Sequence, residues 1–181
     1  TLDLTATEAI CAPFRYITDA TTQTLKVAGT LNGGSNKQLG GLVGVAYGTS
    51  SIVNCIVSAT SSSSYSGDSS HSGFVMRVYN SDTSNLSFTG CAFTGTFDCP
   101  SSDRIAGFVG WRETNNYTIP VTLTNCLFMP ANIDCSATTL NSNFVRSRNG
   151  DNGVTLTNTY YTEGIPASST TTRLADRKSV V

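Results

Sequence analysis

Short apolar segments recur along the chain at a regular interval and are separated by Gly, Asn, Ser and Thr. One segment reads Gly-Leu-Val-Gly at residues 41–44. It returns in looser form at residues 73–76, 107–110 and 143–146. A second segment, in which polar and apolar residues alternate, reads VTLTN at both 121–125 and 154–158. Because the two segments return together at intervals of about 34 residues, the pattern indicates a repeat architecture.

Three strands are predicted in each repeat. The Gly-Leu-Val-Gly segment is a short apolar strand, and the alternating VTLT segment is typical of a half-buried strand. The third strand is expected at residues 29–32, 95–99 and 132–135. One such unit cannot bury its apolar face alone, so the units must stack. We therefore predict an all-β fold, a right-handed parallel β-helix of about four to five coils.

Stacking should align equivalent residues of successive coils in columns along the axis. We expect three inward apolar columns: Leu42, Phe74, Phe108 and Phe144; Ile52, Phe88, Leu123 and Leu156; and Val57, Phe93, Phe128 and Tyr161. A fourth column ends the alternating segment and consists of Asn54, Gly90, Asn125 and Asn158. These residue types favour turns, so we place this column at a corner of each coil.

The repeat divides the chain into three parts. Residues 25–165 carry the repeats, and residues 1–24 contain enough apolar side chains to cap the first coil. Residues 166–181 have few large apolar groups and are expected to form an extended tail. The tail is expected to dock on another subunit and link protomers head to tail, or else to lie along the solenoid's own flank. The chain begins at Thr1 without Met or a signal-like segment, so we expect a processed or excised piece.

The segment at 41–44, with variants beginning at Gly73 and Gly107, resembles the GLUG repeat, named for Gly-Leu-hydrophobic-Gly. Such repeats occur in large secreted and surface proteins, among them bacterial adhesins and the noncatalytic regions of immunoglobulin-A-directed metallopeptidases. Met76, Asn143 and Arg146 depart from the motif. The resemblance implies an extracellular, repetitive, noncatalytic scaffold and supplies no catalytic residues.

Composition narrows the function classes. A net charge of −1 with 13% charged residues argues against a nucleic-acid-binding surface. No apolar run approaches the roughly 18–20 residues that span a bilayer. Six cysteines in a Ser/Thr-rich chain indicate an oxidising compartment. We therefore expect a secreted or cell-surface protein without a membrane span.

The spacing of the cysteines favours disulfides within a coil. Cys91 and Cys99 in one repeat match Cys126 and Cys135 in the next, whereas the fourth repeat lacks both, with Thr159 in the first position. Because both members disappear together, we predict the pairs Cys91–Cys99, Cys126–Cys135 and, from the remaining two, Cys11–Cys55. Two alternatives stay open: pairing between coils, as Cys99–Cys135, and a ladder of unbonded thiols.

Few residues predict catalysis. His71, the one histidine, lies in the polar stretch GDSSHSGF without nearby metal-ligand partners, and we expect a solvated turn residue. Asp98 and Asp134 occupy equivalent positions and should stack on one face, as the acids of carbohydrate-active β-helices do. The matching residue of the first repeat is Asn32, and polar strand-end residues are the simpler interpretation. We predict no catalytic residue, metal site or cofactor.

A set of arginines follows the Gly-Phe-Val segment and is a candidate binding stripe with an aromatic neighbour: Arg77, Trp111, Arg112, Arg146 and Arg148. Tyr79 lies nearby in the sequence. Such a stripe could hold acidic glycans or a protein carboxylate, whereas solvated surface charges are the simpler interpretation.

The outward positions of the alternating segment predict two further columns, Ser51, Ser87, Thr122 and Thr155 beside Val53, Thr89, Thr124 and Thr157. A flat Thr-x-Thr array is similar to the face of β-solenoid ice-binding proteins, although Thr is also common in exposed strands. Two sequons, at Asn85 and at Asn116, are glycosylation candidates in a secreted chain.

These observations together predict a noncatalytic structural or adhesive β-helix module. Its expected partners are other copies of itself, extracellular proteins or glycans, with no nucleic acid. The alternative functions are a polysaccharide-processing β-helix enzyme, based on Asp98 and Asp134, and an ice-binding protein, based on the threonine columns.

Overall fold

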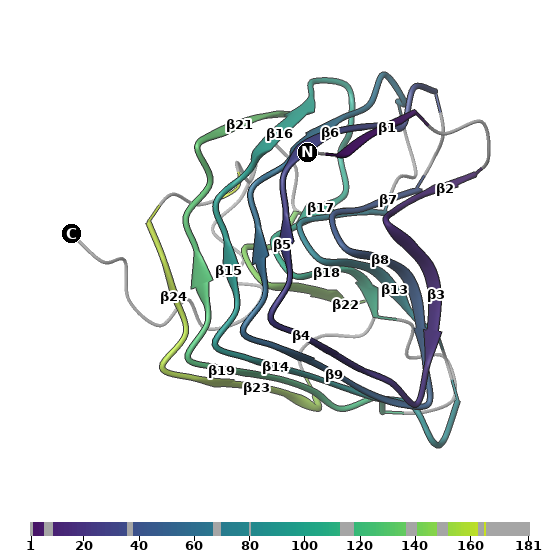
Figure 1. Cartoon of the computed structure of the whole chain (residues 1–181), viewed down its shortest axis with the longest axis vertical. Coiled ribbons are helices and arrows are strands. Elements are labelled where there is room, and N and C mark those ends of the chain that lie inside the picture. Colours follow the sequence, from purple (N-terminus) through teal and green to yellow (C-terminus); the bar gives the residue numbers. More distant parts are fainter. Residues whose placement is uncertain are drawn as a thin grey trace.

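The chain folds as a stack of parallel sheets. The structure, a computed structural model, describes residues 2–5, 9–35, 38–66, 70–79, 81–112, 118–136, 141–147, 152–162 and 165. Their named strands form five parallel sheets, A to E in the order in which the chain meets them, and these residues contain no helix. The chain passes through the sheets in turn and then enters the next coil (Figure 1). The predicted all-β parallel solenoid is confirmed.

Each sheet takes one strand from each coil. Sheet A contains β1 (Leu2–Thr5), β6 (Gly29–Asn32), β11 (Thr60–Ser62), β16 (Thr96–Cys99) and β21 (Asn132–Cys135). Sheet B contains β2 (Ile10–Cys11), β7 (Gln38–Gly40), β12 (Ser70–Ser72) and β17 (Ile105–Ala106). Sheet C contains β3 (Phe14–Thr18), β8 (Val43–Tyr47), β13 (Val75–Val78), β18 (Val109–Arg112) and β22 (Val145–Ser147).

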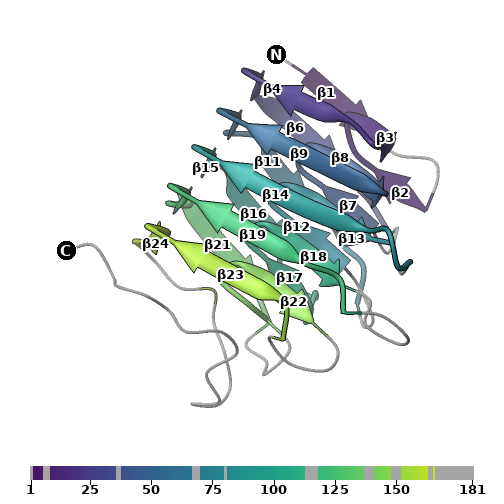
Figure 2. The same cartoon turned by 90° about the horizontal axis from the view of Figure 1, so that it is seen from below.

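The remaining two sheets complete the coil. Sheet D contains β4 (Thr21–Gln23), β9 (Thr49–Val53), β14 (Asn85–Thr89), β19 (Val121–Thr124) and β23 (Val154–Thr157). Sheet E contains β5 (Lys26–Val27), β10 (Ile56–Val57), β15 (Ala92–Phe93), β20 (Leu127–Phe128) and β24 (Tyr160–Tyr161). Strands β1 to β20 make four turns, and β21 to β24 add most of another (Figure 2).

Two features of the coil differ from the sequence prediction. Each turn has five strands rather than three, because sheets B and E consist of strands of two or three residues, too short to show a periodic pattern. Strands β1 to β4, which fall in the segment expected to be a separate cap, pair in register with β6 to β9. This segment is therefore the first coil of the solenoid. The tail at 166–181 lies outside the described residues.

The three predicted inward columns are present. Strand register joins Ile52, Phe88, Leu123 and Leu156 in sheet D and Val57, Phe93, Phe128 and Tyr161 in sheet E. The rings of Phe74 and Phe108 stack with centroids 4.8 Å apart. Both side chains are fully buried. Packed aromatic columns therefore run through successive coils and hold them together.

The predicted corner is also present and lies between sheets D and E. Asn54, Gly90, Asn125 and Asn158 have φ angles of 51°, 64°, 54° and 47°, and Thr24 has 56° at the same place in the first coil. This left-handed conformation costs least for Gly and Asn. The Asn158 side chain also donates to Oδ1 of Asn125 at 3.2 Å. The repeated Asn therefore serves a sharp bend of the backbone.

The first glycine of the Gly-Leu-Val-Gly segment has a packing role. A Cβ at Gly41 would overlap the carbonyl oxygen of Gly73, and a Cβ at Gly73 would overlap that of Gly107. A Cβ at Gly107 would also lie 2.7 Å from Cδ2 of Phe128, which reaches across from sheet E. Glycine is therefore needed where the next coil and an inward ring both come close.

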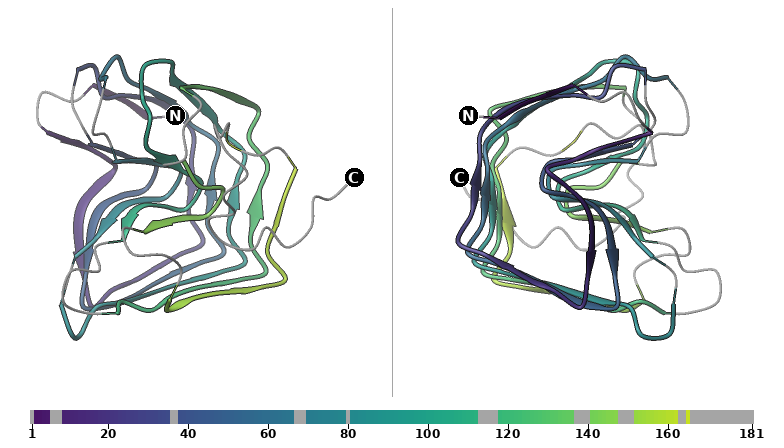
Figure 3. Two further views of the ribbon diagram at one scale, coloured as in Figure 1. Left: turned by 180° about the vertical axis from the view of Figure 1, so that it is seen from behind. Right: turned by 45° about the vertical axis from the view of Figure 1, so that its right-hand side comes forward.

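The second glycine is the second residue of sheet C strands β8 and β18. The chain path bends inward between sheets B and C (Figure 3). A Cβ at Gly44 would lie 2.6 Å from Cγ2 of Ile10 in sheet B. A Cβ at Gly110 would lie 3.0 Å from the carbonyl oxygen of His71, also in sheet B. The small residue lets the two sheets approach at this bend, and the Gly-Leu-Val-Gly pattern is explained by close packing on both sides of one strand.

Candidate binding surface

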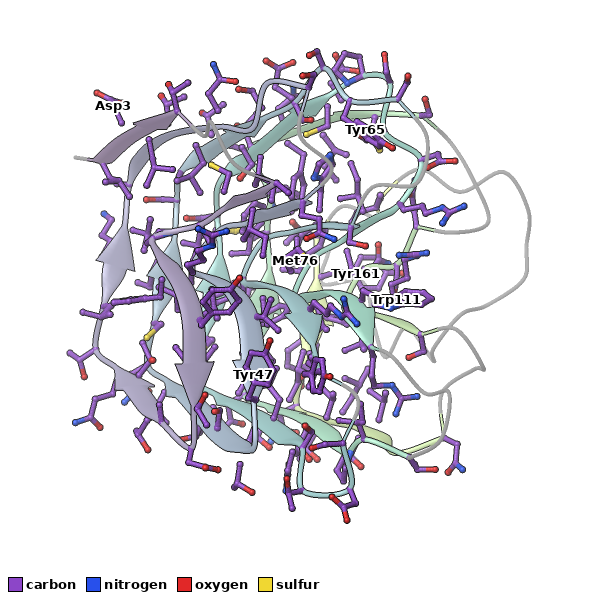
Figure 4. All side chains as sticks on the ribbon, turned by 90° about the vertical axis from the view of Figure 1, so that its right-hand side faces the viewer. Asp3, Tyr47, Tyr65, Met76, Trp111 and Tyr161 are labelled. Carbon is purple, nitrogen blue, oxygen red and sulfur yellow. The ribbon has the colours of Figure 1, made fainter. Side chains whose placement is uncertain are left out.

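The outer side of sheet C gathers aromatic and arginine side chains from successive coils. Strand register places one column of residues along the axis: Tyr16, Val45, Arg77 and Trp111. Tyr16 is 52% exposed, and Arg77 and Trp111 are partly exposed. Trp111 and Tyr47 lie on the side of sheet C turned to the viewer in Figure 4. We call this surface, made by Arg15, Tyr16, Tyr47, Arg77, Tyr79 and Trp111, the sheet C face.

Three tyrosines form a continuous ladder on this face. The rings of Tyr47 and Tyr79 are inclined by 32° with centroids 4.7 Å apart. Tyr16 extends the ladder to the first coil, with its centroid 6.2 Å from that of Tyr47. These distances lie in the range of favourable aromatic pairs. The ladder therefore presents apolar ring surface across three coils.

Arginine side chains lie against the aromatic rings. The guanidinium carbon of Arg15 is 5.5 Å from the Tyr16 centroid, and that of Arg77 is 5.7 Å from the Tyr79 centroid. Cations at such distances are attracted to the ring face. The rings therefore hold cationic groups beside the exposed apolar surface, where a ligand could meet both.

The strands of sheet C carry positive charge only. Their sequences FRYIT, VGVAY, VMRV, VGWR and VRS contain four arginines and no Asp, Glu or Lys. The chain as a whole has a net charge of −1. Two of the four, Arg15 and Arg77, belong to the sheet C face, whereas Arg112 and Arg146 are buried.

The structure brings together part of the arginine stripe expected from the sequence. Arg77 and Trp111 are register partners, and the Arg146 guanidinium lies 4.3 Å from the Trp111 centroid. Arg146 is only 3% exposed and donates to the carbonyl oxygen of Gly110 at 3.2 Å. It therefore packs against the indole ring as a buried group. Arg148 lies outside the described residues.

Arg112 has a different environment from the rest of the stripe. It is fully buried, and its Nε donates to Oγ of Ser147 at 2.8 Å. Its Nη1 donates to the carbonyl oxygens of Ile119 and Asn152 at 2.9 and 2.6 Å. Adjacent strand residues point to opposite sides of a sheet, so Trp111 faces outward and Arg112 faces inward. Arg112 therefore connects neighbouring segments of the last coils and is not part of the sheet C face.

Sequence reasoning missed Arg15, Tyr16 and Tyr47. The first two lie in the segment that was interpreted as a cap. A signal for the tyrosine ladder was nevertheless present, because Tyr47 and Tyr79 stand at the same offset from Gly41 and Gly73. Alignment on the glycine, rather than a search for charge, would have found this column.

The two aspartates singled out from the sequence are neighbours on another sheet. Asp98 and Asp134 are register partners at the ends of β16 and β21, and both are exposed. The same column of sheet A continues through Ser62 to Asn32. A shallow groove lies here, lined by Asn32, Gly34, Ser62, Ser63, Ser64, Asp98 and Pro100. The two predicted carboxylates therefore lie on neighbouring coils, beside a polar groove.

The outer side of sheet D contrasts with the sheet C face. Strand register produces one column of hydroxyl residues and a second column beside it: Thr21, Ser51, Ser87, Thr122 and Thr155, then Gln23, Val53, Thr89, Thr124 and Thr157. In the first coils the Thr21 and Ser51 hydroxyl oxygens are 3.0 Å apart. The two columns expected from the sequence are thus present on the outer side of sheet D. Gln23 and Val53 interrupt the second column.

The predicted disulfides are absent from the described residues, which include all six cysteines. Cys91 ends the corner before sheet E, whereas Cys99 ends β16 of sheet A. Cys99 is instead the register partner of Cys135 in the next coil, in the arrangement of the between-coil alternative but without a bond. Repeated cysteines therefore mark equivalent positions on neighbouring coils rather than partners within one coil.

One cysteine column has a hydrogen-bonding role that explains its replacement by threonine. The Cys91 thiol donates to the carbonyl oxygen of Ile52 at 3.3 Å, in the neighbouring coil. The Thr159 hydroxyl donates in the same way to the carbonyl oxygen of Leu123 at 3.2 Å. A small side chain that donates to a carbonyl group is what this corner requires, and either residue supplies it.

The thiols of Cys91 and Cys99 are held in the protonated form. A hydrogen bond to Cys126, together with burial, raises the pKa of the Cys91 thiol. Burial, and then the nearby charge of Asp98, raises the pKa of Cys99 to about 12. Because the thiolate is the reactive species, the two cysteines are poor nucleophiles at neutral pH.

His71 is placed differently from the sequence expectation. It is the central residue of β12, is fully buried, and has apolar register partners, Leu39 and Ile105. Neither ring nitrogen has a hydrogen-bond partner. Burial lowers the pKa of His71 to about 4. His71 is therefore a neutral core residue, and the expected solvated turn is wrong.

Of the two glycosylation candidates, one lies among the described residues. Asn85 begins β14 and is exposed, whereas the Asn116 sequon lies outside the described residues. Within the described ranges no group of three or more His, Cys, Asp or Glu side chains is arranged to hold a metal ion. The described residues contain no helix that is long and apolar enough to cross a membrane.

Comparisons with protein-family models, curated proteins and solved structures found no match to this chain.

Proposed function

We propose that this chain is a noncatalytic adhesive module of a secreted or cell-surface protein. In this proposal the solenoid is a rigid support, and the sheet C face is the surface that binds a partner. The observation that carries the proposal is the tyrosine ladder Tyr16, Tyr47 and Tyr79 with Arg15 and Arg77 against its rings. Large exposed aromatic side chains grouped on one face are typical of binding surfaces.

The support comes from how the solenoid distributes its side chains. Packed columns such as Phe74 on Phe108 run along the axis inside the coils and keep the coils in register. The outer side chains of successive coils are thereby fixed at a spacing of about 4.8 Å. A rigid array of this kind loses little side-chain entropy on binding, which suits an extended partner that touches several coils.

The experiment is an adhesion assay on immobilised glycans and extracellular proteins. A triple variant, Tyr16→Ser, Tyr47→Ser and Tyr79→Ser, is compared with the intact chain. The matched control changes the sheet D side instead, with Thr122→Ala, Thr124→Ala and Thr157→Ala. We expect adhesion to be lost in the sheet C variant only. Equal adhesion by both variants would remove the proposed function.

A second candidate function is polysaccharide cleavage at Asp98 and Asp134. The observation in its favour is that these exposed carboxylates are register partners beside a groove. Neighbouring strands are about 4.8 Å apart, close to the roughly 5–5.5 Å between the carboxyl groups of retaining glycosidases. Release of reducing sugar that disappears in Asp98→Asn and Asp134→Asn would establish this alternative. Without such release the pair is a polar strand end.

A further inference from the structure

We propose that the two end coils of the solenoid bind each other, so that copies of this chain stack head to tail into a filament. The partner is a second copy, whose first coil continues the last coil of its neighbour. This inference goes beyond the proposed function and does not depend on the sheet C face. The two coils concerned, β1 to β5 and β21 to β24, lie at opposite ends of the stack (Figure 2).

The end coils leave part of the core uncovered. In the middle coils the inward rings are fully buried, as Phe88 and Phe93 are. Among the described residues, the half-buried apolar side chains that pack against this core all belong to the two end coils: Leu2, Leu4, Ala20, Ile133, Cys135, Val154, Leu156 and Tyr161. Removing such side chains from water is favourable. Each end therefore offers an apolar centre to a partner of the same cross-section.

The strands of both end coils are also open on one side. Strands β1 to β5 each stand last in their sheets, and β21 to β24 stand last at the other end of sheets A, C, D and E. Each of these strands therefore has a neighbour on one side only among the described strands. An edge strand presents backbone N–H and C=O groups that can pair with a further strand. The ends can thus bind through the backbone as well as through apolar side chains.

The hydrogen bonds between coils identify which backbone groups would pair. At the corner between sheets D and E, an N–H of one coil donates to a carbonyl oxygen of the next coil. Four such bonds of 2.8 to 2.9 Å follow one another: Thr24 to Val53, Asn54 to Thr89, Gly90 to Thr124 and Asn125 to Thr157. The next donor in this series is the N–H of Asn158. Its equivalent acceptor is the carbonyl oxygen of Gln23 in a second copy, because Gln23 and Val53 are register partners.

A second series in sheet E runs in the opposite sense, from a later coil back to an earlier one. Its bonds of 2.8 to 3.0 Å lead from the N–H to the carbonyl oxygen: Ile56 to Leu25, Ala92 to Cys55, Leu127 to Cys91 and Tyr160 to Cys126. Lys26 is the register partner of Ile56. The series would therefore continue from the N–H of Lys26 in a second copy to the carbonyl oxygen of Thr159. Donors and acceptors of the two ends are complementary when both copies point the same way.

Strand register also matches apolar side chains across the junction. One column of sheet A begins with Leu4 and ends with Ile133, so Ile133 would lie on Leu4 of the second copy. One column of sheet E begins with Val27 and ends with Tyr161. At the first coil a hollow is lined by Leu2, Lys26, Val27 and Ala28. The Tyr161 ring would lie at this hollow, as Phe128 lies on Phe93 at 5.5 Å within the solenoid.

Charge does not oppose the junction in sheets A and D. Asp134 ends the column that begins with Thr5, and Asp3 begins the column that ends with Asn132. Stacking therefore places no carboxylate against another in sheet A. The end strands of sheet D, with the sequences TTQ and VTLT, contain no charged residue. Edge strands without charges are the ones that pair most readily with another chain.

The direction of the junction determines the assembly. A head-to-head junction would make the strands antiparallel, so both hydrogen-bond series would be interrupted. Joining a first coil to a last coil continues them and leaves one open end on each copy. A heterologous contact of this kind does not close at two copies and grows as a filament.

The test is sedimentation velocity of the intact chain over a series of concentrations, with electron microscopy of the same samples. We expect species larger than a dimer that grow with concentration, and unbranched filaments one solenoid wide. A monomer at every concentration up to about 1 mM would overturn the inference. A dimer that does not grow further would also overturn it, because a head-to-head contact closes at two copies.

Two variants, each changed at one end, test the direction. Leu4→Lys places a charge in the first end and Ile133→Lys in the last end, so each alone should need roughly tenfold or more higher concentration to assemble. In a mixture, the last end of the Leu4→Lys chain meets the unchanged first end of the Ile133→Lys chain, and growth should stop at a one-to-one dimer. A mixture without this dimer would contradict a head-to-tail junction. Ile56→Lys is the matched control and should assemble as the intact chain does, because Ile56 is 40% exposed on the outer side of sheet E.

A backbone variant keeps the test decisive if a lysine variant fails to fold, which thermal unfolding of each variant shows. Lys26→Pro removes the N–H that would donate to Thr159 of the neighbouring copy. The carbonyl groups of Leu25 and Val27, which accept from Ile56 and Ser58, remain in place. Proline is tolerated in an edge strand at such a position, so we expect a folded chain whose assembly needs roughly tenfold higher concentration. Unchanged assembly of folded Lys26→Pro would overturn the inference and leave the adhesion assay unaffected.

Discussion

The inward and outward sides of the same strands differ in how strictly they repeat. Inside, Phe74, Phe108 and Phe144 follow one another with almost no exposure. Outside, the equivalent strands of sheet C carry aromatic and arginine side chains, whereas those of sheet D carry hydroxyl groups. The interior repeats because each coil must fit the next at close packing density. The outer side chains do not have to fit the next coil in this way. We therefore expect function at the outer positions where the residue type departs from the repeat.

The largest effect should come from breaking an inward column. Phe108→Ala removes a fully buried ring that stacks on Phe74 at 4.8 Å, and we expect a loss of about 3–5 kcal/mol in the free energy of unfolding. Phe14→Ala is the matched control, because Phe14 is 41% exposed and should cost less than about 1 kcal/mol. Urea denaturation measures both. Equal losses would contradict the contrast between inner and outer positions.

A smaller effect should come from His71, a buried titratable group whose register partners Leu39 and Ile105 are apolar. The folded pKa of His71 is lowered by burial from 6.5 to about 4, so the unfolded chain takes up a proton first as the pH falls. The stabilising contribution is therefore complete above pH 6.5 and is lost as the pH falls toward 4. The loss should reach about 3 kcal/mol.

Urea denaturation at a series of pH values measures this loss. The control is His71→Leu, which matches the apolar partners Leu39 and Ile105 and should not have this component of the pH dependence. If the two proteins lose stability in parallel between pH 6.5 and 4, another group is responsible and the neutral core role of His71 is wrong.

The residue at the corner between sheets D and E lies neither in an inward column nor on an outer face, and its role can be tested by substitution. Asn125 has a φ of 54° and accepts a hydrogen bond from Asn158, so Asn125→Ala should cost about 1 kcal/mol or slightly more. Asn125→Gly should be nearly neutral, because Gly90 occupies the same place in the previous coil. Thermal unfolding of the two variants compares them directly. Equal losses for the two variants would show that the amide contact, which both variants lack, matters more than the backbone conformation.

The smallest effect should come from exchanging residues within the thiol and hydroxyl column. Cys126→Thr should change the free energy of unfolding by less than about 1 kcal/mol, since Thr159 makes the equivalent hydrogen bonds. A reducing agent should leave the melting temperature of the intact chain unchanged, because no disulfide is present among the described residues. A clear fall in melting temperature on reduction would contradict the structure and restore the disulfide prediction.

The repeat made much of the interior predictable from the sequence. Landmarks such as Gly73 and the VTLTN segment fixed the inward columns and the Asn corner, because strict packing imposes the same residue type on every coil. The strands of sheets B and E were missed, since strands of two or three residues have no measurable period. The segment 1–24 was predicted as a cap, although its strands β1 to β4 pair with the next coil, because it lacks the Gly-Leu-Val-Gly segment.

The outer face and the exceptions were harder to predict. Arg112 and Arg77 both follow the landmark, but they stand at different offsets from it, and one residue is enough to reverse the side of the strand. His71 was read from its polar neighbours in SSHSGF, although its repeat position, two residues before the glycine, is shared with Leu39 and Ile105. Position in the repeat therefore predicted burial better than local composition did.

The hydrogen bonds between coils determine how the molecule responds to mechanical force. In every sheet these bonds join one coil to the next, as Leu127 N–H to the carbonyl oxygen of Cys91, so they run along the axis. A pull on the end of the chain acts first on the hydrogen bonds of the terminal strand, so the coils should detach one after another. A sideways pull by a ligand lying across Tyr16, Val45, Arg77 and Trp111 is instead divided among four coils. Attachment through the sheet C face would thus resist flow or shear better than attachment through an end of the solenoid.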